Sequence, residues 1–201
     1  MSRIFLVRHG ETGWHSENRY AGSSDVALTE RGHHQARLLA EWSKTAHLSH
    51  VYVSPLQRAR DTAAPVEQAT GLHAHVDERL REVDFGIAEG LTATELKRLF
   101  PEAWATFIRD PVTHSFRGGE HPDAAAARVH SAVDEIAITC GPQARVLLVA
   151  HNTLFRLLLC SLLGVPLSRY RALFPSLRNG AVTELEFVVG NVALLSLNVP
   201  L

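Results

Sequence analysis

The sequence of 201 residues contains little cysteine, and its two cysteines, Cys140 and Cys160, form neither a CxxC pair nor a disulfide framework. This excludes a small disulfide-stapled secreted domain and predicts a protein of a reducing compartment, the cytoplasm. An excess of one charge is also missing, because 20 lysines and arginines stand against 21 aspartates and glutamates, for a net charge of −1. Such a balance is atypical of general nucleic-acid binders and of polybasic membrane-surface binders.

Long hydrophobic runs are missing as well. The most apolar stretch, residues 154–165, is shorter than the roughly 20 residues that a membrane-spanning helix needs, and Arg156 interrupts it. The apolar run at residues 4–7 is too short for a signal peptide and is followed at once by Arg8. No repeat, low-complexity tract or long linker divides the chain. We therefore expect one soluble domain over residues 1–201, with neither a membrane nor a nucleic acid as partner; a homodimer is left open.

What the sequence does contain is an alternation of short apolar runs and amphipathic segments. The apolar runs predict strands at residues 4–7, 51–53, near 75–76 and at 146–150. The helical periodicity predicts one helix capped by Thr29 with Gly32, Ala36, Leu39 and Ala40 on its inner face, and further helices at residues 57–70, 122–139 and 154–163. Residues 181–188 and 192–199 predict two β segments joined by a hairpin turn at Gly190-Asn191. This order predicts a three-layer α/β/α sandwich with a mostly parallel central sheet and helices on both faces.

Polar residues follow three of the predicted strands. Arg8 and His9 end the first, Ser54 ends the second shortly before Arg58, and His151 ends the strand at residues 146–150. Ligands of parallel sheets bind at the carboxyl ends of the strands, so we expect these side chains to converge at one edge. Guanidinium groups match phosphate geometry bidentately, and Arg58 is predicted in the first turn of a helix, where N–H groups also bind anions. The sequence therefore predicts a pocket for a multiply charged oxyanion.

Around these positions the chain resembles the histidine phosphatase superfamily, the phosphoglycerate-mutase-like clan. The resemblance runs in order from residue 3 to about residue 165. It is carried by Arg8-His9-Gly10-Glu11-Thr12, Leu28-Thr29-Glu30-Arg31-Gly32, Ser54-Pro55-Leu56-Gln57-Arg58-Ala59 and Gly118-Gly119-Glu120. It implies the family's three-layer α/β fold with a short lid insertion, here about residues 87–120, and phosphoryl transfer through a phosphohistidine without metal or other cofactor.

By this resemblance His9 is the nucleophile, Arg8, Arg58 and His151 clamp the phosphate, and Glu82 is the proton donor. The chemistry of the side chains agrees with these roles. A histidine forms a phosphoryl intermediate only with one ring nitrogen unprotonated, and neighbouring guanidinium groups disfavour the imidazolium form.

The assignment of the acid depends on the resemblance. Glu82 follows the third strand and is suited to protonate the leaving oxygen and then to deprotonate the attacking water. Spacing alone does not separate it from Glu78, Asp84 and Glu89. The family context, a glutamate followed four residues later by Gly86, favours Glu82.

Two positions depart from the family pattern. His15 stands where the family usually has asparagine, and Ala150-His151-Asn152-Thr153 stands where it usually has Ser-His-Gly. We expect His15 and Asn152 to contact the substrate phosphate together with Gly22 and Ser23. The departures are expected to affect substrate fit more than phosphoryl chemistry. The other histidines are scattered, and no HExxH or similar pattern is present, so no metal site is predicted.

The fate of the phosphohistidine separates a phosphatase, which admits water, from a mutase, which excludes it. Residues 83–90 resemble the phosphatase branch, and the lid at residues 91–116 is short. We therefore expect a metal-independent phosphomonoesterase that acts on a small phosphorylated metabolite. A cofactor-dependent phosphoglycerate mutase, and a phosphate-ligand or protein-binding module with weak catalysis, stay open. Packing of the lid onto the body is the favoured role of Trp104, Phe107, Ile108 and Phe116, ahead of walling an apolar pocket.

Overall fold

The structure, a computed structural model, describes residues 1–188 and 191–201. In these residues six strands form one sheet in the order β3-β2-β4-β1-β5-β6. The strands are β1 (Ser2–Arg8), β2 (His50–Val53), β3 (Ala74–Val76), β4 (Arg145–Ala150), β5 (Val182–Val188) and β6 (Asn191–Val199). The first four are parallel; β5 pairs antiparallel with β1, and β6 pairs antiparallel with β5.

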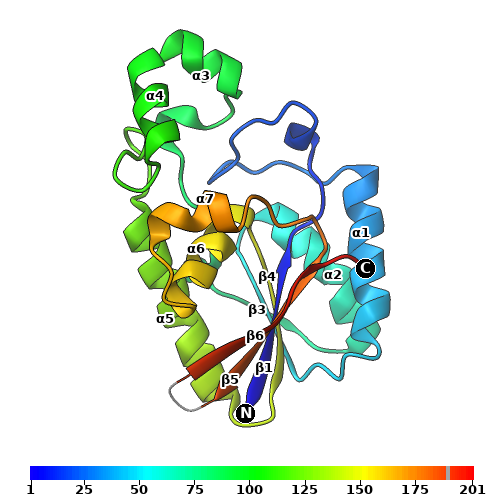
Figure 1. Ribbon diagram of the computed structural model, residues 1–201. Coiled ribbons are helices and arrows are strands. Elements are labelled where there is room, and N and C mark those ends of the chain that lie inside the picture. The colour runs from blue at the N-terminus through cyan, green and yellow to red at the C-terminus, as the bar shows by residue number, and fades with distance from the viewer. Residues whose placement is uncertain (189–190) are drawn as a thin grey trace.

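Helices cover both faces of this sheet (Figure 1), which confirms the predicted three-layer sandwich. Helices α1 and α2 lie on one face and α5 and α6 on the other. The helices of the described chain are α1 (Glu30–Ser43), α2 (Gln57–Thr70), α3 (Ala93–Leu99), α4 (Pro101–Arg109), α5 (Pro122–Cys140), α6 (Asn152–Leu162) and α7 (Tyr170–Leu173). Single 3₁₀ turns are η1 (Gly13–His15), η2 (Glu78–Leu80), η3 (Gly86–Ala88) and η4 (Leu167–Arg169).

Alternation along the central strand divides the core in two. Ile4 and Leu6 of β1 pack among side chains of α5 and α6, whereas Phe5 and Val7 pack among those of α1 and α2. All four are at most 2% exposed. Because successive strand residues point to opposite faces, a continuous apolar run of this kind is what a strand covered on both sides requires.

Several helix boundaries follow from local signals in the sequence. The Thr29 side chain accepts a hydrogen bond from Gly32 N at 3.1 Å and caps α1, and Gly71, with φ of 74°, ends α2. Helix α6 begins at Asn152, earlier than the predicted Leu154, so that it follows His151 directly. The predicted hairpin turn falls partly on Gly190, which lies outside the described residues, while Asn191 already belongs to β6.

Residues 87–120, which we call the lid segment, include α3 and α4 and stand above the carboxyl ends of the parallel strands (Figure 1). Phe107 and Phe116 are each 3% exposed, and their ring centroids are 4.1 Å apart. They therefore pack the lid, as expected. Ile108 is 47% exposed, and Trp104 lines a cavity described below.

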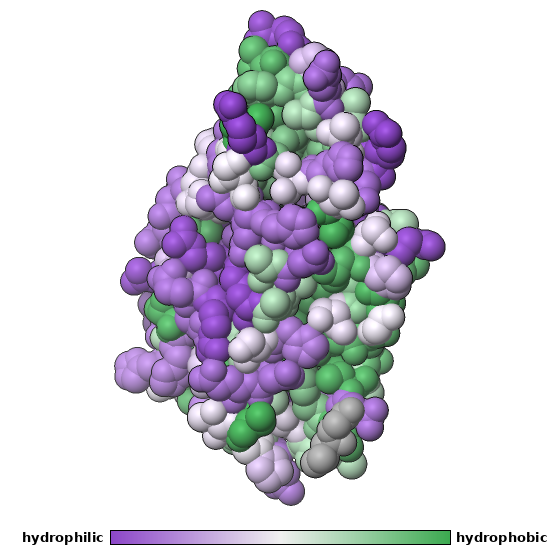
Figure 2. Space-filling view, turned by 90° about the vertical axis from the view of Figure 1, so that its left-hand side faces the viewer, coloured by the Kyte–Doolittle hydropathy of each residue, from purple (hydrophilic) through white to green (hydrophobic). Residues whose placement is uncertain are grey.

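At the opposite, amino-terminal end of the parallel strands the surface is hydrophobic, and this area is visible at the lower right of Figure 2. Leu163, Phe187 and the exposed Ile138 line a hollow of about 950 Å³ there. None of the helices in the described chain is both long and apolar enough to cross a membrane.

Candidate active site

Three strand ends bring the predicted polar residues together. The backbone N–H of His9 donates to Ala150 O at 2.9 Å, so the chain leaves β1 beside the end of β4. His151 follows β4, and its ring centroid lies 5.2 Å from that of His9. Ser54 follows β2 and contacts His151 Nε2 at 2.7 Å through its hydroxyl. The hydrogen-bonded register of the sheet thus sets the spacing of these groups.

His9 has the protonation state and orientation of a nucleophile. Its Nδ1 lies 2.7 Å from Gly10 O; because a carbonyl only accepts, Nδ1 carries the proton and Nε2 keeps its lone pair. Burial, then the charges of Arg58 and Arg8, hold the pKa of His9 well below its ordinary value. The predicted effect of the two arginines is present, with desolvation as the larger cause.

Glycine is required where the loop after His9 meets α1. A Cβ on Gly10 would lie 2.6 Å from Gly32 O, and a Cβ on Gly32 would lie 2.1 Å from Glu11 O. Gly10 N also donates to Thr62 Oγ1 of α2 at 2.9 Å. This close approach explains why Arg8-His9-Gly10 and Thr29-Glu30-Arg31-Gly32 occur together, since one motif holds the other in place.

Arg58 lies directly behind His9 and is completely buried. Its Nε is 3.3 Å from His9 Nε2, while Nη1 donates to Ser24 O at 2.6 Å and Nη2 to Gly22 O at 2.8 Å. The two carbonyls fix the guanidinium group and leave its Nε edge directed at the position where a phosphoryl group would meet His9 Nε2. Burial lowers the pKa of Arg58.

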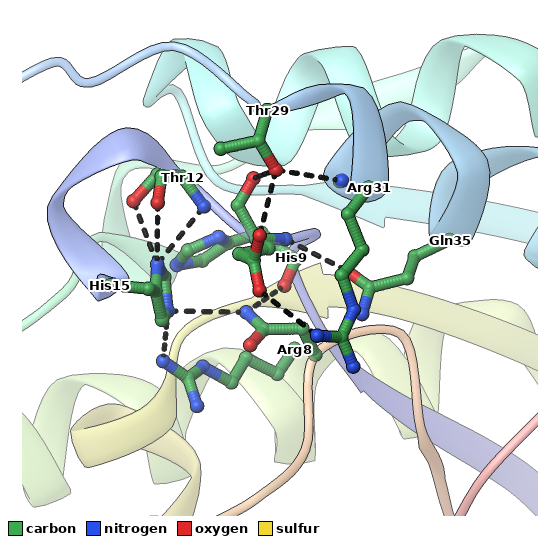
Figure 3. A network of polar contacts seen from close by, with 10 residues as sticks. Arg8, His9, Thr12, His15, Thr29, Arg31 and Gln35 are labelled. Carbon is green, nitrogen blue, oxygen red and sulfur yellow. Dashed lines mark hydrogen bonds and ion pairs between the residues drawn. The ribbon is translucent and has the colours of Figure 1, made fainter.

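Among the described residues, Arg8 contacts a backbone carbonyl oxygen and the ring of His15, and it pairs with no carboxylate. Figure 3 shows the contact with His15. Arg8 Nη1 donates to Leu177 O at 2.7 Å, and Arg8 Nη2 lies 2.5 Å from His15 Nε2. Asn179 Nδ2 also approaches His15 Nε2, at 3.3 Å. Because both neighbours are donors, Nε2 of His15 accepts, while Nδ1 lies 2.8 Å from Thr12 Oγ1 and 3.0 Å from the backbone N of Thr12, which donates to it. Burial, then the charge of Arg8, lowers the pKa of His15 to about 4, so His15 orients Arg8 as a neutral acceptor.

Two buried nitrogens near His9 have no hydrogen-bond partner within the described residues. They are Arg8 Nε and His151 Nδ1. When Nε2 of His151 accepts from the Ser54 hydroxyl, Nδ1 carries the proton and is a donor. Unpaired buried donors are costly, and an anion bound beside His9 would satisfy both.

Glu82 is 7% exposed and lines the cavity that His9 also lines. Its carboxylate accepts from Thr153 N at 3.0 Å and Leu154 N at 2.9 Å, at the amino terminus of α6. The backbone O of Glu82 accepts from Arg128, which is itself paired with Glu120 of the Gly-Gly-Glu block. The Gly-Gly-Glu block thus supports the site, because its Glu120 holds the arginine that binds the backbone of Glu82.

The other acids near Glu82 have different partners. Glu89 accepts from the backbone N–H groups of Gly22 and Ser23, at 2.9 and 3.3 Å. Asp84 accepts from Gly86 N, and Glu78 contacts Arg81. Glu89 thus occupies the N–H groups of Gly22 and Ser23, and their contact with phosphate stays a prediction. Gly22 also contacts Arg58, because its backbone O accepts from Arg58 Nη2.

The cavity has a volume of about 280 Å³ and joins two sets of residues. Arg8, His9, His15 and Glu82 form what we call the His9 end, and Asn152 and Thr153 also line the cavity. The lid end is formed by residues that the sequence did not single out as part of the site: Tyr20, Phe85, Arg156 and Arg171, together with Trp104. The sequence marked Arg156 as unusual, because it is a charged residue within the most apolar stretch of the chain. Nothing in the sequence marked Tyr20, Phe85 or Arg171 as part of the site.

The donors around the cavity suit an anion. Arg8, Arg19, Arg156 and Arg171 outnumber the single acid, Glu82, among the residues that line the whole cavity. Nowhere in residues 1–188 and 191–201 do three histidine, cysteine, aspartate or glutamate side chains gather as metal ligands would.

Comparison with known proteins places this geometry in context. A family model described as "Histidine phosphatase superfamily (branch 1)" matches residues 4–200. Phosphoserine phosphatase 1 of Hydrogenobacter thermophilus is 35% identical over 170 residues, which cover 85% of this chain and 80% of that protein. Probable phosphoglycerate mutase GpmB of Cronobacter sakazakii is 33% identical over 188 residues, 93% of this chain and 86% of that protein.

Solved structures give the same result. A mycobacterial glucosyl-3-phosphoglycerate phosphatase in complex with VO3 matches with a TM-score of 0.88 and 32% identity, over 98% of this chain and 99% of that chain. The α-ribazole phosphatase of Shigella flexneri matches with a TM-score of 0.88 and 27% identity, over 98% and 96% of the two chains.

Proposed function

Since the chain belongs to the histidine phosphatase superfamily and is a phosphoric monoester hydrolase, we propose that it works through a phosphohistidine on His9, without a metal ion. The observation that carries this proposal is the neutral His9 imidazole, with Nε2 unprotonated, near two buried nitrogens, Arg8 Nε and His151 Nδ1, that have no hydrogen-bond partner among the described residues. A small phosphorylated metabolite is the proposed substrate, in keeping with a cavity of about 280 Å³.

In the first half of the proposed reaction His9 Nε2 attacks phosphorus and forms an N–P bond while the ester O–P bond breaks. Arg8 Nε, Arg58 Nε and His151 Nδ1 donate to the three phosphoryl oxygens, which carry the charge of the transition state. Glu82, in its protonated form, transfers its proton to the departing alcohol oxygen. The ester leaves as a neutral alcohol, and Glu82 is left ionised.

In the second half a water molecule attacks the phosphohistidine. Glu82 takes a proton from this water as the O–P bond forms and the N–P bond breaks. Inorganic phosphate is released, and His9 returns to the neutral form that burial and the two arginines favour. The same carboxyl group therefore acts as acid and then as base.

A cofactor-dependent mutase is the second candidate, supported by the 33% identity to a probable phosphoglycerate mutase. In that reaction the phosphohistidine would return its phosphoryl group to a bound product instead of to water.

Phosphate release from p-nitrophenyl phosphate in the presence of EDTA, with and without 2,3-bisphosphoglycerate, separates these functions. We expect many turnovers per active site in both conditions, with inhibition by vanadate, which mimics the transferring phosphoryl group. A mutase would isomerise phosphoglycerate only with the bisphosphate, and a binding module would release no phosphate. Loss of turnover in EDTA that zinc or magnesium restores would contradict metal-independent chemistry.

A further inference from the structure

Two arginines in the cavity have no part in the proposed phosphoryl transfer. Arg156 of α6 and Arg171, which follows Tyr170 at the start of α7, line the same cavity as His9. Arg156 is only 6% exposed. Within the described residues neither side chain forms an ion pair with an aspartate or a glutamate. A buried arginine such as Arg156 is normally paired with a carboxylate, and Arg171 is half-buried.

The contacts that these arginines do make hold them at the cavity wall. Arg156 Nε donates to Phe174 O, and its Cζ lies 4.7 Å from the centroid of the Tyr170 ring. Arg171 Nε donates to Tyr170 Oη at 3.1 Å, and its Cζ lies 4.6 Å from the centroid of the Phe107 ring. These contacts use Nε and the flat faces of the guanidinium groups, and Arg171 Nη2 also lies 3.5 Å from Tyr20 Oη. The terminal nitrogens of Arg156 have no hydrogen-bond partner among the described residues, so they are available to a ligand.

The charges around the cavity do not balance without a ligand, and a phosphate monoester alone does not balance them. Arg8 and Arg58 match the dianionic phosphoryl group, and Arg19 is already paired with Glu17 and Glu95. Among the described residues Arg156 and Arg171 remain without an ion-pair partner, and the single acid that lines the cavity, Glu82, offsets only part of their charge. Holding such charges out of water is unfavourable unless a bound anion compensates them.

We propose that Arg156 and Arg171 form a second anion subsite, so that the preferred substrate is a phosphate monoester carrying a second acidic group. That group is a carboxylate or a second phosphate, since a guanidinium fork binds either in the same way. The inference rests on the proposed function, because His9 sets the position of the first phosphoryl group. Tyr20, Phe85 and Trp104 line the same cavity and restrict the size of the part that joins the two groups.

A purely structural role would predict something different. Arg171 contacts both α7 and Phe107 of the lid segment, so its loss could loosen the lid and weaken turnover of every ester alike. The discriminating quantity is therefore the ratio of kcat/KM for an acidic ester to that for its neutral counterpart, which general loosening leaves unchanged.

Two matched pairs of esters measure this ratio. 3-Phosphoglycerate differs from glycerol 3-phosphate by a carboxylate in place of a hydroxymethyl group, and fructose 1,6-bisphosphate differs from fructose 6-phosphate by a second phosphate. We expect the protein to prefer the acidic member of one pair by at least about 10-fold, as for a charge-assisted hydrogen bond. The pair that shows the preference identifies the acidic group.

Variants assign that preference to residues. Arg171→Gln and Arg156→Gln should each bring the ratio toward one, chiefly through KM of the acidic ester, while Arg171→Lys should keep part of it. Arg169→Gln removes the same charge from an exposed neighbouring position and should leave the ratio intact. A ratio near one in the unaltered protein for both pairs, or a ratio unchanged in both glutamine variants, would overturn the subsite.

Calorimetric binding of the four esters to the His9→Ala protein keeps this test independent of turnover. If the unaltered protein hydrolyses no ester, yet binding favours an acidic ester and Arg171→Gln abolishes that preference, the proposed phosphatase fails and the subsite stands. If all four esters are hydrolysed and bound without preference, the phosphatase stands and the subsite fails.

Discussion

The two ends of the cavity are built from different kinds of structure. At the His9 end, His9 and His151 each follow a parallel strand and are tied to one another by the sheet, as in the bond from His9 N to Ala150 O. At the lid end, Trp104 and Arg171 come from the short helices α4 and α7 and are positioned by side-chain packing on Phe107. A sheet edge fixes its groups in every member of a fold, whereas packed loops and short helices change with the side chains that line them. From this comparison we infer that the His9 end sets the type of reaction and that the lid end sets the choice of substrate.

The largest expected effect concerns Glu82. Glu82→Gln keeps the shape and removes the transferable proton, so kcat for an alkyl phosphate should fall by about 10²–10⁴-fold, the usual size of general acid catalysis. Formation of the phosphoenzyme from p-nitrophenyl phosphate should suffer much less, because nitrophenolate leaves without being protonated. Pre-steady-state measurement of both esters tests this, with the exposed Glu78→Gln as control. Equal slowing of both esters would mean that Glu82 is not the leaving-group acid.

Arg58→Ala should be nearly as damaging and should not depend on the ester. Removing the buried guanidinium takes a donor from the phosphoryl group in both the ground state and the transition state, so kcat/KM should fall by at least about 10²-fold, with KM and kcat both changed. Steady-state kinetics on alkyl and aryl esters measures this, and Arg60→Ala, an exposed position on the same helix, is the matched control. A loss confined to one ester would contradict this prediction and would mean that Arg58 contributes to substrate specificity and not to phosphoryl transfer.

His15 should appear in the pH dependence of stability. The pKa of His15 is about 4 in the folded protein, below the ordinary 6.5. As the pH falls below about 6.5, His15 therefore becomes protonated in the unfolded chain while it stays neutral in the folded protein. The free energy of unfolding should therefore fall as pH decreases from about 6.5 toward 4. His15→Asn should reduce the dependence of the unfolding free energy on pH by up to about 1.4 kcal/mol per pH unit, which corresponds to the uptake of one proton on unfolding. Urea unfolding between pH 5 and 7 measures the slope, and an unchanged slope would refute a neutral, buried His15.

The smallest effect is expected at the lid end. Trp104→Ala removes apolar surface from the cavity wall and should change kcat/KM only by a few-fold, about the value of one partly buried contact, and by different factors for different esters. Ile108→Ala, an exposed position on the same helix, should change nothing. If Trp104→Ala lowered kcat/KM by about 10²-fold for every ester, the lid would contribute to phosphoryl transfer itself. The proposed difference between the two ends of the cavity would then be wrong.

The difference between the two ends of the cavity also explains which parts of the structure could be predicted from the sequence. The layers of the fold and the convergence of Arg8, His9 and His151 were predictable, because apolar strands ending in charged residues leave a strong local pattern. The choice of Glu82 among four nearby acids depended on family resemblance, and its physical basis, the start of α6 at Asn152, lay at a helix boundary that periodicity misplaced.

The lid end could not be predicted in this way. Tyr20 and Arg171 are distant in sequence and meet only through the packing of the lid and α7, with Arg171 Nη2 3.5 Å from Tyr20 Oη. The partners of Gly22 and Ser23 were equally hidden, since nothing local indicates that Glu89 takes up their N–H groups. Tertiary contacts of this kind have no sequence period to reveal them.

The most direct test of the account is the chemical identity of the phosphoenzyme. Substrate should be mixed rapidly with the protein, quenched in alkali, and the phosphorylated residue and ring nitrogen identified by mass spectrometry and ³¹P NMR. The account predicts one acid-labile, base-stable phosphoryl group on Nε2 of His9, absent from the His9→Ala protein. A phosphoryl group on Nδ1 of His9, or label retained by the His9→Ala protein, would contradict it.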